Sequence, residues 1–128
     1  MWQEALQLNG GGEPTETLIY PKIVQTGGAA SFNYNNFDQI DFTPYNYVDV
    51  SYSCTKGSGS NACIVLSYDA TTMASGGLEK GNRIFRKDFG TTAYSDNVTL
   101  DISGISGTQW VGLGAVQTTA TARITFRV

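Results

Sequence analysis

The residue types that carry most enzyme chemistry are missing or dispersed in this sequence. There is no histidine, which excludes Ser-His-Asp and Cys-His arrangements and removes the commonest zinc ligand. Catalysis by paired carboxylates needs two acids across a cleft, one with a raised pKa. The aspartates instead lie scattered in turns or at outward strand positions: Asp38, Asp41, Asp49, Asp69, Asp88, Asp96 and Asp101. We therefore expect a protein that is not an enzyme.

Carboxylates in loops could still hold a structural ion. Asp38, Asp41 and Asp96 are candidates for a calcium site, because calcium prefers carboxylate and carbonyl oxygens. No spaced ligand motif supports such a site. We predict no metal site and no cofactor, with structural calcium as the open alternative.

Trp110 is the first candidate for ligand binding. Sugar rings stack on Trp and Tyr, whose large rings have an apolar face and a polar edge, while sugar hydroxyls bond nearby polar side chains. Alternation places Val111 in the core and Trp110 on the outer face, beside Gly112 and Gly114. Bare backbone at these glycines would leave a shallow strip for a flat ligand or a partner chain. The alternative is that Trp110 belongs to the core and the glycines permit close sheet packing.

Tyr45 and Tyr47 form a second candidate pair. They flank Asn46 after a turn at Pro44, and we expect both rings to be exposed. The alternative is that they are ordinary strand aromatics that cover the end of a sheet.

Short alternating runs must position these residues. Apolar and polar residues alternate with a period of two, the pattern of half-buried strands, over residues 47–53, 62–68 and 120–128. Residues 98–116 are predicted to form two further strands, joined by a Gly/Ser connection that is either a corner or a hairpin. Residues 47–53 and 62–68 are predicted to form a hairpin. About eight strands result. They predict an all-β, antiparallel β-sandwich, jelly-roll-like, with a closed barrel as the alternative.

The sandwich is expected to occupy residues 15–128. Residues 1–14 end in a Gly-rich break and are predicted to form an N-terminal arm or an edge segment; a loop within one sheet is the alternative. Cys54 and Cys63 flank a turn, but alternation places them on opposite faces of the predicted hairpin. A disulfide is therefore not expected.

Charge and hydropathy exclude two kinds of partner. The net charge is −3 and the pI is 4.7, and there is no basic stripe, so nucleic acid is not expected. No apolar run approaches the ~18 residues of a membrane span, so we expect no membrane insertion, and the start of the sequence does not predict a signal peptide.

Two segments carry a resemblance. Residues 41–52 read DFTPYNYVDVSY, and residues 100–112 read LDISGISGTQWVG. Extended over residues 15–128, this pattern resembles small jelly-roll domains in tail and minor structural proteins of phages and prophages of Gram-positive bacteria.

This resemblance implies a non-catalytic, virion-associated structural or accessory domain on a virion or extracellular surface. Its partners would be a surface carbohydrate or other virion proteins, and a homo-oligomer is possible. The alternatives are a carbohydrate-binding module of a bacterial secreted enzyme or adhesin, and a purely architectural domain that self-assembles.

Overall fold

Strands make up all the regular structure that can be described. The computed structural model describes residues 18–20 and 30–128, and no residue in these ranges is helical. The strands are β1 (Leu18–Tyr20), β2 (Asn33–Asp41), β3 (Tyr47–Cys54), β4 (Cys63–Asp69), β5 (Asn82–Asp88), β6 (Tyr94–Asp101), β7 (Thr108–Val116) and β8 (Ala120–Arg127). None of the described residues belongs to a helix long and apolar enough to cross a membrane. The predicted N-terminal segment, residues 1–14, lies outside the described residues.

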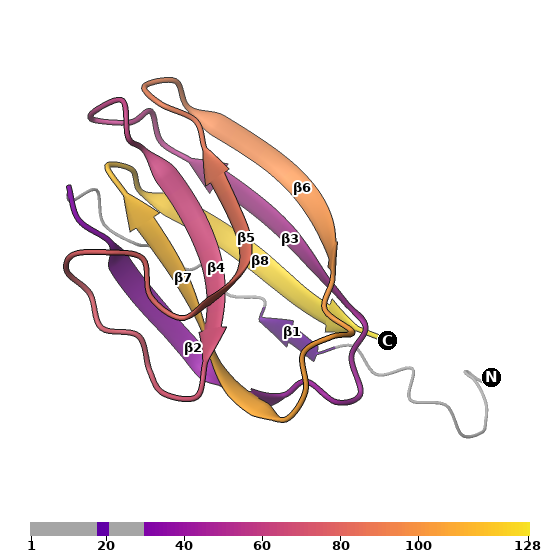
Figure 1. Cartoon of the computed structure of the whole chain (residues 1–128). Helices are drawn as coiled ribbons and strands as arrows, with labels where there is room; N and C mark the ends of the chain where they lie inside the picture. Colours follow the sequence, from indigo (N-terminus) through magenta and orange to yellow (C-terminus); the bar gives the residue numbers. More distant parts are fainter. Residues whose placement is uncertain (1–17, 21–29) are drawn as a thin grey trace.

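The strands form two four-stranded sheets that pack face to face (Figure 1). Sheet A has the order β1-β8-β3-β6, and sheet B has the order β2-β7-β4-β5. All pairings are antiparallel, and four of them are nested along the chain: β1 with β8, β2 with β7, β3 with β6, and β4 with β5. The predicted antiparallel β-sandwich is confirmed.

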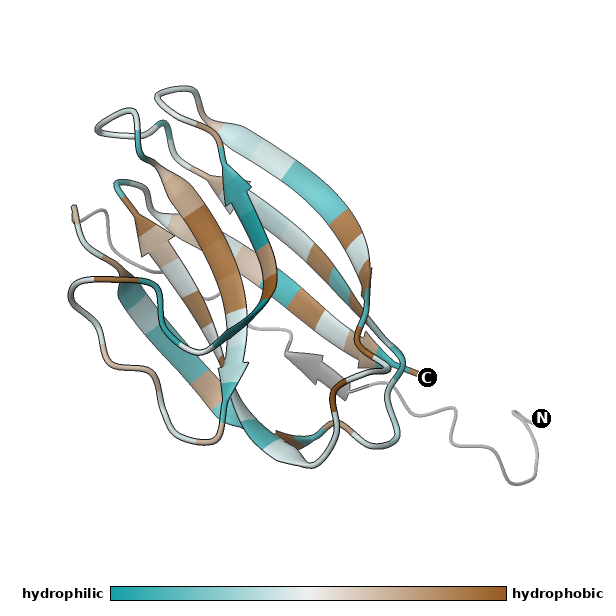
Figure 2. Ribbon diagram, in the orientation of Figure 1, coloured by the Kyte–Doolittle hydropathy of each residue, from teal (hydrophilic) through white to brown (hydrophobic). Residues whose placement is uncertain are grey.

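The main core lies between the sheets and follows from alternation along the strands. In β3 and β8 every second residue is at most 4% exposed, and the residues between them face outward. Figure 2 shows these positions as alternating bands along both strands. Sheet B supplies the opposite wall. The buried residues of this core are Ile40, Phe42, Val48, Val50, Tyr52, Cys54, Ile64, Leu66, Ile102, Val111, Leu113, Ala115, Ala120, Ala122, Ile124 and Phe126.

The predicted hairpin between residues 47–53 and 62–68 is wrong. These segments are β3 and β4, which belong to different sheets, so connection 55–62 crosses the sandwich. Packed sheets lie about 10 Å apart, a gap that a loop of this length spans easily. Segment 98–116 likewise forms a corner rather than a hairpin, because β6 lies in sheet A and β7 in sheet B.

Both cysteines are free and buried. Cys54 points into the main core, whereas Cys63 belongs to a smaller cluster with Phe32, Val65 and Val116 on the outer side of sheet B. The two thiols therefore face different apolar layers.

The loop between β4 and β5 covers part of the outer face of sheet B. The Met73 amide donates to Asn36 Oδ1 over 3.0 Å, and Asn36 Nδ2 donates to the Met73 carbonyl over 3.0 Å. The Lys80 amide donates to the Tyr34 hydroxyl over 2.8 Å. These bonds hold Met73 and Tyr34 against β7, so sheet B has apolar packing on both sides.

Candidate functional site

The outer face of sheet A carries almost only polar side chains across β6, β3 and β8. We call this surface the polar face. It consists of the residues that alternate with the buried core positions: Tyr47, Asp49, Ser51, Ser53, Ser95, Asn97, Thr99, Asp101, Thr121, Arg123, Thr125 and Arg127. None of the described segments packs over it as the β4–β5 loop packs over sheet B.

The strand register arranges this polar face in rows. Ser51 of β3 lies opposite Asn97 of β6 on one side and opposite Arg123 of β8 on the other. We call these three residues the central row. Neighbouring strands lie 4.7–4.9 Å apart, so the row extends about 10 Å across the sheet.

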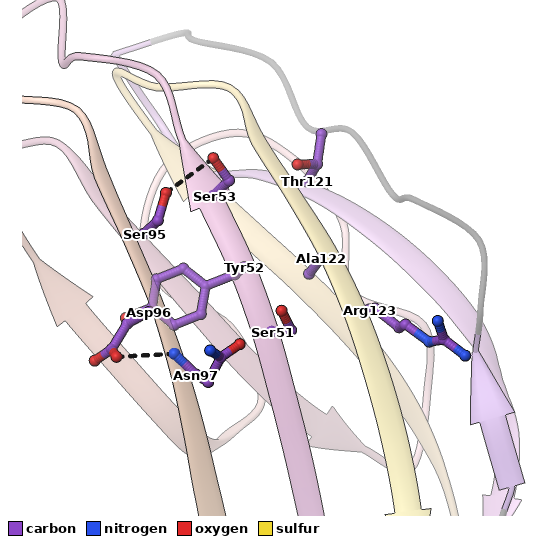
Figure 3. A pocket seen from close by; sticks show the side chains of 9 residues that line it. All are labelled: Ser51, Tyr52, Ser53, Ser95, Asp96, Asn97, Thr121, Ala122 and Arg123. Carbon is purple, nitrogen blue, oxygen red and sulfur yellow. Dashed lines mark hydrogen bonds between the residues drawn. The ribbon is translucent and has the colours of Figure 1, made fainter.

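Two shallow hollows meet at the central row. The larger has a volume of about 520 Å³ and lies toward Ser53, Ser95 and Thr121 (Figure 3). The smaller has a volume of about 300 Å³ and lies toward Asp49 and Thr125. Ser51, Asn97 and Arg123 line both hollows. A ligand that fills either hollow would therefore contact the same three side chains.

The rows on either side bond within themselves. Ser95 Oγ donates to Ser53 Oγ over 3.0 Å. In the other row, Asp49 accepts from Thr99 Oγ1 over 2.6 Å and from Arg127 Nε over 2.7 Å. The Thr99 hydroxyl and the Arg127 guanidinium lower the pKa of the Asp49 carboxyl from its ordinary value. This carboxylate is therefore neutralised within the protein.

The central row differs, because its side-chain groups have no hydrogen-bond partner among residues 18–20 and 30–128. All three side chains are exposed. Asn97 is engaged only through its main chain, whose amide donates to Asp96 Oδ1 over 2.8 Å. The Ser51 hydroxyl, the Asn97 amide and the Arg123 guanidinium thus offer hydrogen-bond donors in one row. The hydroxyl oxygen and the amide oxygen can also accept hydrogen bonds.

Tyr47 lies at one end of the polar face. Its side chain is 38% exposed, and the Arg127 guanidinium lies 4.7 Å from the centre of its ring. Because Arg127 is also bonded to Asp49, the ring and the guanidinium are held together. This pair gives the polar face one amphipathic platform.

Tyr45 does not join this platform, so the expected exposed pair is wrong in part. Tyr45 is half-buried against the main core, and its ring centre lies 6.0 Å from that of Phe126. Asn46 between the two tyrosines is tied down, since its amide donates to the Arg127 carbonyl and its carbonyl accepts from the Ile102 amide. Residues two apart share a face only within a strand, and β3 begins at Tyr47, so Tyr45 in the preceding turn is not bound by this alternation.

Trp110 lies on the outer face of sheet B, away from the polar face. It is half-buried and is flanked in register by Gln39 and Asp69. The bare glycine strip expected beside it is absent. A side chain at Gly112 would lie 2.6 Å from Met73 Cε, and one at Gly114 would lie 2.6 Å from Tyr34 Cε1. The glycines admit these covering side chains, so their backbone is not bare.

The three calcium candidates do not converge. Asp38 and Asp41 belong to β2 in sheet B, whereas Asp96 belongs to β6 in sheet A. Asp41 Oδ1 accepts from the Thr43 amide over 3.0 Å, and hydrogen bonds from Thr43 lower the pKa of this carboxyl. Within residues 18–20 and 30–128, no three acidic or cysteine side chains gather as a metal site would require.

The sequence contained part of the signal for the polar face. Alternation in β8 places Arg123, Thr125 and Arg127 on its outer side, and alternation in β3 does the same for Ser51. The central row depends on the pairing of β3 with both β6 and β8, strands distant in sequence. Composition along one strand does not reveal that pairing.

No protein-family model matches the chain, and no curated protein sequence matches it.

Proposed function

We propose that this domain binds a surface glycan through the polar face of sheet A and acts without catalysis. The observation that carries the proposal is the central row, where the side chains of Ser51, Asn97 and Arg123 lie between two hollows and bond no other described residue. Sugar hydroxyls both donate and accept hydrogen bonds, so they complement a row of hydroxyl, amide and guanidinium groups.

The strand ladder supports this use because it fixes the row before any ligand arrives. β3 is bonded on both sides, to β6 and to β8, along its whole length. Side chains on such a ladder lose little backbone freedom on binding, which lowers the entropic cost of association. At the end of the face, the Tyr47 ring offers an apolar surface to a sugar ring.

A glycan suits this surface better than a protein partner does. The centre of a protein interface is usually rich in aromatic and apolar side chains and poor in charge. The centre of the polar face contains serine, asparagine, threonine and arginine, with its aromatic residue at one end. Hydrogen bonding therefore dominates what the face offers.

We also infer that the sandwich is a jelly roll. Its support is the nested pairing of β1 with β8, β2 with β7, β3 with β6 and β4 with β5. Such pairing is that of a long antiparallel ribbon folded over into two sheets. Together with the sequence resemblance to phage tail domains, it supports a virion or extracellular setting for the glycan-binding role.

The test is a glycan array of neutral and acidic bacterial surface glycans. Ser51→Ala/Asn97→Ala should abolish the wild-type signal while leaving the fold intact, because both side chains are exposed and neither bonds another residue in the described part of the chain. Thr108→Ala, an exposed position on sheet B, is the matched control and should bind like wild type.

Trp110→Ala separates this proposal from the site suggested by sequence alone. It should bind like wild type, since Trp110 lies on the other sheet. Loss of binding in Trp110→Ala with retention in Ser51→Ala/Asn97→Ala would place the ligand on sheet B. Absence of any wild-type signal would refute glycan binding.

A further inference from the structure

The arginines of this chain differ in one respect that bears on the ligand. Arg83 and Arg86 both bond Glu79, and Arg86 also bonds Asp88 over 3.0 Å. Arg127 bonds Asp49 over 2.7 Å. Arg123 is the remaining arginine of the sequence, and it forms no ion pair with any described residue. It is also the one that belongs to the central row.

The carboxylates near Arg123 are already engaged. Asp49 is bonded to Arg127 and to Thr99. Asp96, at the rim of the larger hollow, accepts from the Asn97 amide and from the Tyr94 hydroxyl. Figure 3 shows the Asp96 carboxylate and the Arg123 guanidinium pointing to opposite sides of the hollow. The positive charge at the centre of the polar face is therefore uncompensated by these acids.

The groups beside Arg123 suit an anion that is part of a larger polar ligand. A guanidinium binds a planar carboxylate through two parallel hydrogen bonds and binds a sulfate similarly. The Ser51 hydroxyl and the Asn97 amide are further donors in the same row, positioned for the hydroxyls that flank such a group on a sugar ring.

We propose that the glycan bound by the polar face is anionic, with its carboxylate or sulfate on Arg123 and neighbouring hydroxyls on Ser51 and Asn97. This inference rests on the proposed glycan-binding function and names the class of glycan. An anionic glycan is proposed because its charge complements that of Arg123. The overall charge of the chain, −3, would otherwise repel an anion.

The experiment compares forms of one backbone by titration calorimetry. The probes are a uronic-acid oligosaccharide that binds on the array, its carboxyl-reduced neutral form, and a sulfated derivative of the neutral form. Hydrogen bonds to a charged group should make an anionic form bind about 10- to 100-fold more tightly than the neutral form. The difference should shrink as salt is raised, because the site is exposed.

Three variants assign the effect to Arg123. Arg123→Gln should lose the preference for the anion while still binding the neutral form, and Arg123→Lys should keep part of it, because lysine supplies charge without the planar fork. Arg83→Gln removes the same charge from sheet B and should keep the whole preference. Thermal unfolding checks that each variant folds.

The outcomes distinguish the preference for an anionic glycan from the proposed glycan binding itself. Tighter binding of the carboxylated or the sulfated form supports the inference and identifies the anion. Equal binding of anionic and neutral forms, or a preference that survives in Arg123→Gln, overturns it, while loss of binding in Ser51→Ala/Asn97→Ala would still uphold the polar face. No glycan binding by the wild type overturns both.

Discussion

Gly114 of β7 offers a sharp test of how sheet B is packed. A Cβ at this position would lie 2.6 Å from Tyr34 Cε1, 2.9 Å from Tyr34 Cζ and 2.9 Å from Val65 Cγ1. The Tyr34 ring cannot easily retreat, because it stacks on Phe32 and its hydroxyl accepts from the Lys80 amide. Gly114→Ala should therefore overpack the outer face of the sheet.

Two terms set the expected size of the effect. Overpacking a well-filled site typically costs about 1–3 kcal/mol. Replacing a strand glycine by alanine restores about 0.5–1 kcal/mol of backbone entropy. Neither Gly114 nor Gly112 has a positive φ, so that gain applies at both positions. The free energy of unfolding of Gly114→Ala should fall by about 1–2 kcal/mol.

Gly112→Ala is the matched control in the same strand. Its nearest contact would be Met73 Cε at 2.6 Å, the end of a flexible side chain that can rotate away. The two terms should nearly cancel, leaving stability within about 0.5 kcal/mol of wild type. Urea unfolding followed by fluorescence measures both variants. Equal stability of the two, or a more stable Gly114→Ala, would refute the close packing of Tyr34 on β7.

Three further predictions concern other polar and thiol groups. Asp49→Asn should lower stability by no more than about 1 kcal/mol, because the ion pair with Arg127 is exposed. Because folding lowers the pKa of Asp49, the ionised carboxylate contributes to the stability of the fold above the unfolded pKa of about 3.9, and this contribution is lost in stronger acid. The difference in Tm between Asp49→Asn and wild type should therefore close below about pH 4 and not widen. Thr118→Val should cost about 1–3 kcal/mol in urea unfolding, since the buried Thr118 hydroxyl donates to the Thr55 carbonyl over 2.7 Å; an unchanged midpoint would show that this bond is dispensable. Burial raises the pKa of the Cys54 thiol to about 11, so at pH 8 a disulfide reagent should react with it only after unfolding, and rapid labelling of the native chain would contradict that burial.

Strands such as β3 and β8 could be predicted because their residues alternate clearly between core and solvent. Val48, Val50 and Ile124 face the core, as the period of two indicates. The pairing partners could not be predicted, because alternation fixes a face and not a neighbour. Residues 47–53 and 62–68 therefore looked like a hairpin although they lie in opposite sheets. The bulge in β2 between Asn36 and Gln39 likewise has no signature in the alternation.

For the candidate site too, the sequence predicts which face a residue lies on but not which residues lie beside it. Tyr47 and Trp110 were placed on outer faces by alternation, and both are partly exposed there. Their separation onto different sheets follows from the long-range topology, as does the covering of Gly112 by Met73. The central row escaped prediction because its members come from three strands, and no one of the three side chains is distinctive alone.

The most direct test of the central proposal is an NMR titration of the ¹⁵N-labelled chain with the glycan that binds most tightly on the array. Glycan binding at the polar face predicts the largest amide shift changes at Ser51, Asn97 and Arg123, with Trp110 unaffected. Changes centred on Trp110, or no localised change at a saturating glycan concentration, would contradict it.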